Sequence, residues 1–340
     1  MSSILVLNQT IFQTTLRADA LLRLLPRGAY TTARSVGSRG VFEFETHVKR
    51  TAASCASLLK PSQQQQQQFP AIATEIGLRS RLATSMRLAT QALRSQLLSI
   101  SESNASSLPD VKLTCLLLTD LSDIDKCCTT TGLLRTYLGD ISDMDIDKRL
   151  LTSVTNEEGL IVLHATLLPT RRLPPIKCVV AGAPRTNALA KDSEWVRART
   201  SLEATKKDDV EEILLSDTNE GRVLEGTQTN VFALIDNVLY TAGGADVLEG
   251  TVRRLVIEVC KLHDIPIIFE APKLGGIDTP KWSGAFLTST SRLVLPINEI
   301  EYTDSSNGSI INKVFEQNEL IDRIEKLVNQ AVDSHCTNIL

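Results

Sequence analysis

The stretch that decides the fold is Leu224-Glu225-Gly226-Thr227-Gln228-Thr229-Asn230-Val231-Phe232. An apolar segment before it, residues 213–216, predicts a short strand, and turn-forming residues follow at 217–222. The chain then returns as a second strand, and Glu225 falls next to a glycine where a buried strand ends. A carboxylate in an apolar sheet needs a cationic partner. Glu225 is therefore predicted to face a positively charged group.

A second feature lies downstream, where Gly250-Thr251 opens a helix predicted over residues 252–263. The first N–H groups of a helix have no partner within the helix and bind anions well. A buried carboxylate followed by such a helix start suits a ligand with a protonated ring nitrogen at one end and a phosphate at the other.

Three pieces of sequence carry a resemblance to a known family: residues 225–232, 239–241 and 248–253. In order and spacing they resemble the signature of the class IV aminotransferases, and a match in several parts is more specific than one short motif. These are the fold-type IV pyridoxal 5'-phosphate (PLP) enzymes, which include branched-chain and D-amino-acid aminotransferases and aminodeoxychorismate lyase. The departure is Thr251, where the family usually carries an aliphatic residue.

The resemblance implies an α+β / α/β fold with two domains. We expect a small N-terminal α/β domain over residues 1–169, a linker over 170–175, and a larger PLP-binding domain with a mixed sheet and helices over 176–340. The glutamine-rich segment 61–70 is expected to be a surface insertion, because it lacks residues that could form a core. Hydrophobic periodicity predicts helices over 18–25, 45–60, 76–100, 193–206 and 317–332, and strands over 4–7, 28–34, 41–44, 112–118, 160–165, 176–181, 230–235, 238–241, 265–269, 285–288 and 293–297. The acidic segment 120–147 receives no assignment.

Composition excludes several classes of protein. The chain has 340 residues, 42% apolar and 22% charged, with a net charge of −4, which is typical of a globular protein and offers no basic surface for nucleic acid or anionic membrane. No apolar run approaches the roughly 20 residues of a membrane span. Four scattered histidines and the absence of Cys/His ligand spacing argue against a metal site. A nicotinamide dehydrogenase is disfavoured because no Gly-x-Gly-x-x-Gly follows a strand.

Localisation is expected to be cytoplasmic. Seven scattered cysteines, without a disulfide framework, indicate a reducing compartment. The first forty residues hold five arginines and one acidic residue, which is the pattern of a transit peptide, so an organelle is the alternative. Against it, residues 28–50 already match the family's small domain.

Lys191 and Glu225 are the main candidates for the chemistry. Lys191 lies where a loop meets a predicted helix, and such a lysine is ordinarily a surface charge. The resemblance implies instead that Lys191 forms the Schiff base with PLP and is the catalytic residue, because it precedes Glu225 by about the interval found in the family. Glu225 would pair with the ring nitrogen, and Arg50, at the end of the run Thr46-His47-Val48-Lys49-Arg50, would grip the phosphate.

The resemblance implies further cofactor contacts from Thr251, Val252 and Thr290, all toward the phosphate. One departure concerns Trp195. Many relatives carry Asn-Tyr three and four residues after the lysine, and the tyrosine contacts the phenolic oxygen of the cofactor. Here Glu194 and Trp195 occupy these places, and an indole can only donate a hydrogen bond, so the contact would change its form.

Substrate contacts are expected from Tyr30, Thr32, Arg34 and Ser291. The sequence Thr31-Thr32-Ala33-Arg34 resembles that of aminodeoxychorismate lyases more than that of branched-chain aminotransferases. The substrate-binding arginine of the branched-chain enzymes is missing, since Thr32 falls near its place.

Three functions stay open at this point. The leading hypothesis is a PLP-dependent, homodimeric aminotransferase of amino acid metabolism that moves an amino group between a small amino acid and a 2-oxo acid. The second is aminodeoxychorismate lyase, which would use the same lysine to form 4-aminobenzoate and release pyruvate. The third is a non-catalytic module that keeps the fold for binding.

Overall fold

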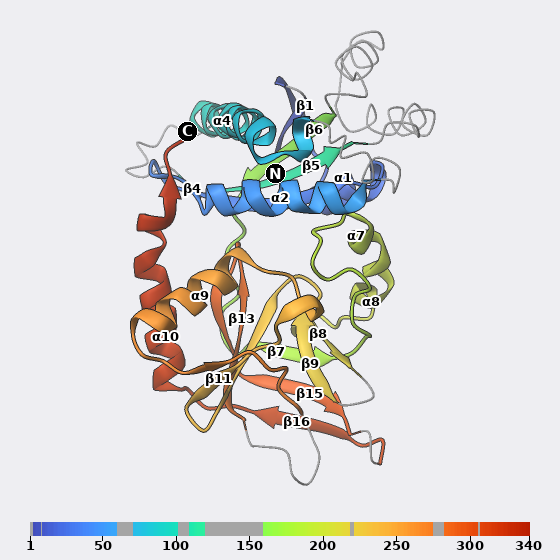
Figure 1. Ribbon diagram of the computed structural model, residues 1–340, viewed down its shortest axis with the longest axis vertical. Helices are drawn as coiled ribbons and strands as arrows, with labels where there is room; N and C mark the ends of the chain where they lie inside the picture. Colours follow the sequence, from blue (N-terminus) through green and yellow to red (C-terminus); the bar gives the residue numbers. More distant parts are fainter. Residues whose placement is uncertain are drawn as a thin grey trace. The chain divides into compact units, whose positions relative to one another are not determined.

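The computed structural model describes residues 3–7, 9–59, 71–100, 109–119, 159–217, 221–274, 282–304 and 307–340. The chain divides into two compact units (Figure 1). The first comprises Met1–Pro169, Ala190–Arg197 and His335–Leu340, and the second comprises Thr170–Leu189 and Ala198–Ser334. Two sheets with their own helices confirm the expected α+β, two-domain class. The exact domain bounds stay a prediction; two short segments from the second half of the chain pack in the first unit.

The first unit is built on an antiparallel sheet with strand order β17-β4-β3-β5-β6-β1-β2. Its strands are β1 Ser3–Leu7, β2 Thr10–Thr14, β3 Ala29–Val36, β4 Gly40–Phe42, β5 Val111–Leu118, β6 Leu160–Leu167 and β17 Cys336–Thr337. Its helices are α1 Ala18–Leu24, η1 Ala71–Ala73, α2 Phe44–Leu58 and α4 Glu75–Ile100. The alternation of side chains along a strand gives this sheet two buried faces.

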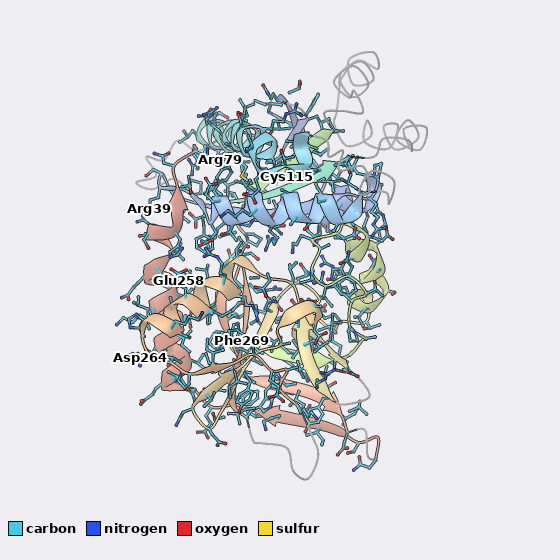
Figure 2. The ribbon with its side chains drawn as sticks, in the orientation of Figure 1. Arg39, Arg79, Cys115, Glu258, Asp264 and Phe269 are labelled. Carbon is cyan, nitrogen blue, oxygen red and sulfur yellow. The ribbon has the colours of Figure 1, made fainter. Side chains whose placement is uncertain are left out.

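Each face of the first sheet has its own helices. Ala33 of β3 and Leu113 of β5 pack with α2 and α4 in one core cluster. Cys115 belongs to the same cluster (Figure 2). Tyr30 of β3 packs on the opposite face with α1 and with Val196. Residues 30 and 31 therefore point to opposite sides of the sheet, which determines what each can contact.

The second unit contains a mixed sheet with strand order β12-β11-β10-β9-β8-β7-β15-β16, and β13 and β14 branch from β10. Its strands are β7 Lys177–Val180, β8 Val210–Asp217, β9 Arg222–Gly226, β10 Asn230–Ile235, β11 Val238–Tyr240, β12 Ile267–Ile268, β13 Trp282–Ser289, β14 Leu293–Ile297, β15 Glu299–Thr303 and β16 Ile310–Val314. Its helices are α8 Thr200–Ala204, η2 Gly244–Asp246, α9 Thr251–Leu262 and α10 Glu319–Ala331, and η3 Asp333–His335 ends at the boundary of the unit. Strand β10 pairs with β9, β11 and β13, so it joins the elements that carry the expected cofactor contacts.

Helix α9 packs against β13 and α10 through its apolar stripe Val252, Leu255, Val256 and Val259. Helix α10 begins where the Asn318 side chain accepts hydrogen bonds from the Leu320 and Ile321 N–H groups. Because α9 is packed along its whole length, the direction of its axis and the position of its N-terminus are fixed.

Three sequence expectations need correction or fall outside the described residues. The helix predicted over 193–206 is two short helices, α7 Glu194–Ala198 and α8. The break falls at Arg199, whose buried guanidinium donates to the Thr227 carbonyl (3.0 Å), a tertiary contact that periodicity cannot reveal. The strand predicted over 41–44 ends at Phe42, because Glu43 has a positive φ of 54° and α2 begins at Phe44. The glutamine-rich insertion and the acidic segment 120–147 lie outside the described residues.

Candidate active site

The segment that carries Lys191 is bonded to β3 and α2 within the first unit. The Lys191 carbonyl accepts the Tyr30 N–H (2.8 Å), and the Lys191 N–H donates to the Ser54 hydroxyl (3.0 Å). Ser193 exchanges two hydrogen bonds with Gly28, one through its N–H (2.9 Å) and one through its hydroxyl (3.0 Å). These bonds hold the backbone on both sides of the lysine, so its position relative to β3 is fixed.

Asp192 adds an ion pair to this anchor. Its carboxylate accepts from Arg27 Nε (3.0 Å) and Nη2 (2.6 Å) and from the Glu194 N–H (2.9 Å). The last bond caps the start of α7. The Asp192 side chain is only 8% exposed, so the pair is partly shielded from water and contributes more than an open surface bridge would.

Arg50 belongs to a partly buried cluster on the α2 side of β3. Arg50 Nη2 donates to the Thr31 hydroxyl (3.1 Å) and lies 3.3 Å from His47 Nδ1, while the Thr31 hydroxyl lies 2.7 Å from the same nitrogen. A guanidinium can only donate, so His47 Nδ1 is an acceptor and the imidazole proton resides on Nε2. Within the described part of the chain, this buried Nε2 has no hydrogen-bond partner.

The electrostatics of this cluster disfavour further positive charge. Burial, together with the charges of Arg50 and Lys191, holds the pKa of His47 well below its usual value, so the imidazole is neutral at physiological pH. Burial also lowers the pKa of Arg50 to about 10. The Lys191 ammonium lies 4.9 Å from the centre of the Tyr30 ring. Lys191, Arg50 and Tyr30 are thus brought together, and a bound anion would offset the charges of Lys191 and Arg50.

Glu225 is buried at the end of β9 in the second unit, where it is 4% exposed. Arg185 Nε donates to Glu225 Oε1 (2.7 Å), and the Leu248 N–H donates to Oε2 (3.2 Å). The cationic partner that the sequence demanded is therefore present within the protein itself. A carboxylate has about four acceptor sites, so it can accept more than two hydrogen bonds.

Asn230 links Glu225 to the start of α9. It is the cross-strand partner of Glu225, and its side-chain amide donates to the Leu248 carbonyl (2.8 Å). A Cβ atom on Gly250 would lie 2.1 Å from Asn230 Oδ1, so a glycine is required at this approach. The carboxylate and the N-terminus of the helix are therefore fixed relative to each other through Asn230 and Leu248.

The first turn of α9 presents hydrogen-bond donors at this place. Gly250 precedes the helix, and its position provides no side-chain cap for the N–H groups of Thr251 and Val252. The Thr251 hydroxyl lies 3.2 Å from the Thr290 hydroxyl, which comes from the turn between β13 and β14. Two backbone donors and two hydroxyl groups at a helix N-terminus suit a phosphate.

The remaining predicted site residues have fewer contacts that bear on their predicted roles. Thr32 and Arg34 share the Tyr30 side of β3, but Arg34 is bound by Asp110 (2.5 Å), which also accepts the Gly37 N–H. Arg34 therefore holds the end of β3 in place. Trp195 and Ser291 are partly exposed, Trp195 on α7 and Ser291 in the β13–β14 turn, and their roles stay predictions.

Sequence reasoning missed Arg185, His47 and Ser54 as members of the site. Arg185 could have been chosen from the sequence, because an arginine among small residues ahead of Lys191 is a natural counter-ion for a buried glutamate. His47 and Ser54 lie on α2 three residues before and four residues after Arg50, and this helical spacing places them on the same face of the helix as Arg50. Their hydrogen bonds depend on how α2 packs on β3.

Two further observations concern the described residues as a whole. These residues hold no group of three or more His, Cys, Asp or Glu side chains suited to a metal ion. Among the helices searched, none is both long and apolar enough to cross a membrane.

Comparison with known proteins finds a family match over part of the chain. Residues 140–300 match the model described as amino-transferase class IV. A probable branched-chain-amino-acid aminotransferase of Rickettsia conorii is 30% identical over 140 residues, which are 41% of this chain and 45% of that protein. The chain thus spans about half the length of that curated relative.

Solved structures share the fold over nearly the whole chain. A branched-chain aminotransferase from Thermoproteus uzoniensis with norvaline has a TM-score of 0.61 at 16% identity, covering 98% of this chain and 96% of that one. The PLP-bound form of a hypothetical aminotransferase from Mycobacterium tuberculosis has a TM-score of 0.61 at 14% identity, covering 97% and 99%. The family match covers residues 140–300, and the solved aminotransferase structures share the fold over nearly the whole chain.

Proposed function

We propose that the chain is a PLP-dependent aminotransferase that moves an amino group between a small amino acid and a 2-oxo acid. The observation that carries the proposal is the fixed pairing of a buried carboxylate, Glu225, with the N-terminus of α9 through Asn230 and Leu248. The two features suit the two ends of PLP, a ring nitrogen that can hold a proton and a phosphate. Few other small ligands would call for both.

The donor set fits the phosphate. In this proposal the N–H groups of Thr251 and Val252 and the hydroxyls of Thr251 and Thr290 bind its oxygens. Arg50 would add a charge-assisted bond. The lowered pKa of Arg50 supports this assignment, because an anion would offset the cost of burying its charge.

The donor set also fits the ring. Glu225 would accept the ring N–H and keep that nitrogen protonated, and Trp195 would lie toward the phenolic oxygen as a donor. When bound, PLP supplies the electron sink for the reaction. Lys191 would be the point of covalent attachment, and its amine, once released, would carry the proton that leaves the substrate Cα. The bonds from Tyr30 and Ser54 to the Lys191 backbone would hold that amine in register.

Transfer of an amino group is favoured over the lyase reaction. The curated relatives that match are named branched-chain-amino-acid aminotransferases, although that name describes those proteins. The residues that suggested the lyase have local contacts here: Thr31 bonds to Arg50 and His47, and Arg34 bonds to Asp110. Tyr30, Thr32 and Ser291 remain the proposed substrate contacts.

The proposal extends to assembly and location. A homodimer would be the working form, as checked by light scattering during gel filtration, with neither nucleic acid nor membrane as a partner. A reducing compartment such as the cytoplasm is proposed on the cysteines, because Cys55, Cys115, Cys178, Cys260 and Cys336 are all free thiols.

The test is chemical labelling of the cofactor attachment site. Purified protein loaded with PLP is reduced with borohydride and digested, and the label is mapped by mass spectrometry. The expected label lies on the Lys191 peptide, and Lys191→Ala should abolish it. Lys206→Ala is the control: it removes another lysine that precedes Glu225 in the sequence and should leave the label in place. A label on Lys206 or Lys207, or none in protein that has been exposed to excess PLP, refutes the proposal.

A further inference from the structure

Arg292 joins the turn between β13 and β14 to two glutamates of β8. Its Nε donates to Glu211 Oε1 (2.6 Å), and its Nη1 donates to Glu212 Oε2 (3.3 Å). The side chain of Arg292 is 18% exposed, and those of Glu211 and Glu212 are 13% and 3% exposed. Charged groups this far removed from water persist together only in good geometry, so the three residues form a specific ion cluster.

A bulge in β8 lets one arginine reach two consecutive glutamates. Consecutive residues of a regular strand point to opposite faces of the sheet. Here the pairing with β7 shifts by one residue after Val210, so Glu211 is an extra residue on β8. A bulge re-aims side chains locally, and both carboxylates meet the same guanidinium.

The β13–β14 turn has a strained backbone. It comprises residues 290–292 and is closed by the strand pair Ser289–Leu293. Leu293 has a positive φ of 55°, a left-handed conformation that is disfavoured for a residue with a Cβ atom. Within the turn, the Arg292 N–H donates to the Ser289 hydroxyl (3.2 Å). A strained turn keeps one conformation only when its surroundings hold it, and the ion cluster is such a hold.

Thr290 lies two residues before Arg292 in the same turn. Its hydroxyl lies 3.2 Å from the Thr251 hydroxyl at the start of α9. The place of the Thr290 hydroxyl relative to the first N–H groups of α9 therefore depends on how the turn is anchored to β8.

The ion cluster also reaches the segment between β9 and β10. Glu212 Oε1 accepts a hydrogen bond from the Thr227 hydroxyl (2.6 Å). A Cβ atom on Gly226 would lie 2.8 Å from Glu212 Cγ, so this glutamate is packed closely against the end of β9. Glu212 thus contacts both segments that carry the expected cofactor contacts, the one after Glu225 and the one with Thr290.

Resting on the proposed function, we propose that Arg292 is a positioning residue for the phosphate end of the cofactor site. Its ion pairs with Glu211 and Glu212 hold the β13–β14 turn so that the Thr290 hydroxyl faces the first turn of α9. The two carboxylates offset the charge of Arg292, so the residue acts by placing Thr290. It therefore serves binding of the phosphate group and not of the pyridine ring.

The experiment compares PLP with pyridoxal, which has the same ring and aldehyde but no phosphate. Dissociation constants are measured by fluorescence titration of the apoprotein. Arg292→Met should raise the constant for PLP about tenfold or more, the effect of misplacing one hydrogen bond to a charged group. The constant for pyridoxal should not change. An equal loss of affinity for both ligands, or no loss for PLP, overturns the inference.

Two further variants distinguish positioning from a direct effect of charge. Glu211→Gln keeps the charge of Arg292 and replaces its 2.6 Å charge-assisted contact by a neutral one. It should weaken PLP binding, whereas stronger binding would mean that Arg292 acts as a free cation. In a Thr290→Val background, Arg292→Met should cost little more, because the hydroxyl that it places is gone; additive losses overturn the inference.

The matched control is Arg171→Met, which removes an arginine–glutamate pair with Glu325 elsewhere in the same unit. It should change neither dissociation constant. Thermal melts verify folding, and Arg292→Gln replaces Arg292→Met if the latter does not fold.

A second measurement needs no cofactor and so separates this inference from the proposed function. Amide hydrogen exchange in the apoprotein is followed by mass spectrometry in peptides that cover residues 289–293 and, as an internal reference, residues 230–235 of β10. Arg292→Met should speed exchange in the first about tenfold or more and leave the second unchanged. If wild type binds neither PLP nor pyridoxal, the proposed function fails. If exchange at residues 289–293 is the same in wild type and Arg292→Met, the positioning role fails, whatever the cofactor does.

Discussion

Arg50→Met should weaken PLP binding while leaving the fold intact. Arg50 is bonded to the Thr31 hydroxyl and lies beside His47 Nδ1, so methionine keeps much of the packing of the side chain and removes the charge and its donors. A charge-assisted hydrogen bond contributes about 1.5–3 kcal/mol. At about 1.4 kcal/mol for each factor of ten, the dissociation constant of PLP should rise by about 10- to 150-fold.

The same variant has a second consequence that needs no cofactor. The charge of Arg50 is one of the causes of the low pKa of His47, after burial. Arg50→Met should therefore raise the pKa of His47 toward its usual value without restoring it, because burial and Lys191 remain. The imidazole carbon signals in NMR, recorded across a pH series on apoprotein, measure this change.

Lys49→Met is the matched control, because Lys49 is the exposed neighbour of Arg50 on α2 and the substitution removes the same charge. It should change neither the PLP affinity nor the titration of His47. An unchanged dissociation constant in folded Arg50→Met would refute the phosphate assignment. An unchanged His47 titration would refute the account of the cluster's electrostatics.

Two further predictions concern stability. In Gly250→Ala, the new Cβ would lie 2.1 Å from Asn230 Oδ1 and displace Asn230 from the Leu248 carbonyl. The free energy of unfolding measured in urea should therefore fall by about 1–3 kcal/mol, and PLP binding should weaken. Stability and affinity equal to those of wild type would contradict this prediction. Burial lowers the pKa of His47 and of His164, so the native state binds fewer protons than the unfolded chain below about pH 6.5. The histidine contribution to apoprotein stability should be fully present above that pH and be lost on acidification below it, by up to about 1.4 kcal/mol per pH unit for each histidine. His47→Asn should reduce this slope, and equal slopes in urea titrations of the two proteins below about pH 6.5 would contradict the buried neutral imidazole.

Most helices and strands could be predicted from the sequence because their signals are local. The apolar stripe of α9 repeats at helical spacing, and β5 and β6 are apolar runs of strand length between polar segments. Strand β16 was missed, since it is short and only alternate residues are partly covered. The helix over 193–206 was wrong because the buried Arg199 contact overrode a favourable local pattern.

The two ends of the candidate cofactor site could also be anticipated. A glutamate beside a glycine at a strand end and a Gly-Thr step before a helix are short-range features with direct physical meaning. The structure connects them through Asn230, which pairs with Glu225 and approaches Gly250. That connection depends on the register of β9 and β10.

What the sequence by itself determined, then, is the set of elements, the order of the chemistry-bearing residues and the resemblance to a family. Only the tertiary structure decided which partner each charged group has: Arg185 for Glu225, Asp110 for Arg34, and Thr31 with His47 for Arg50. The reason is physical. Periodicity records which face of an element is buried, whereas an ion pair between residues far apart in the chain depends on packing and register, which no local pattern specifies.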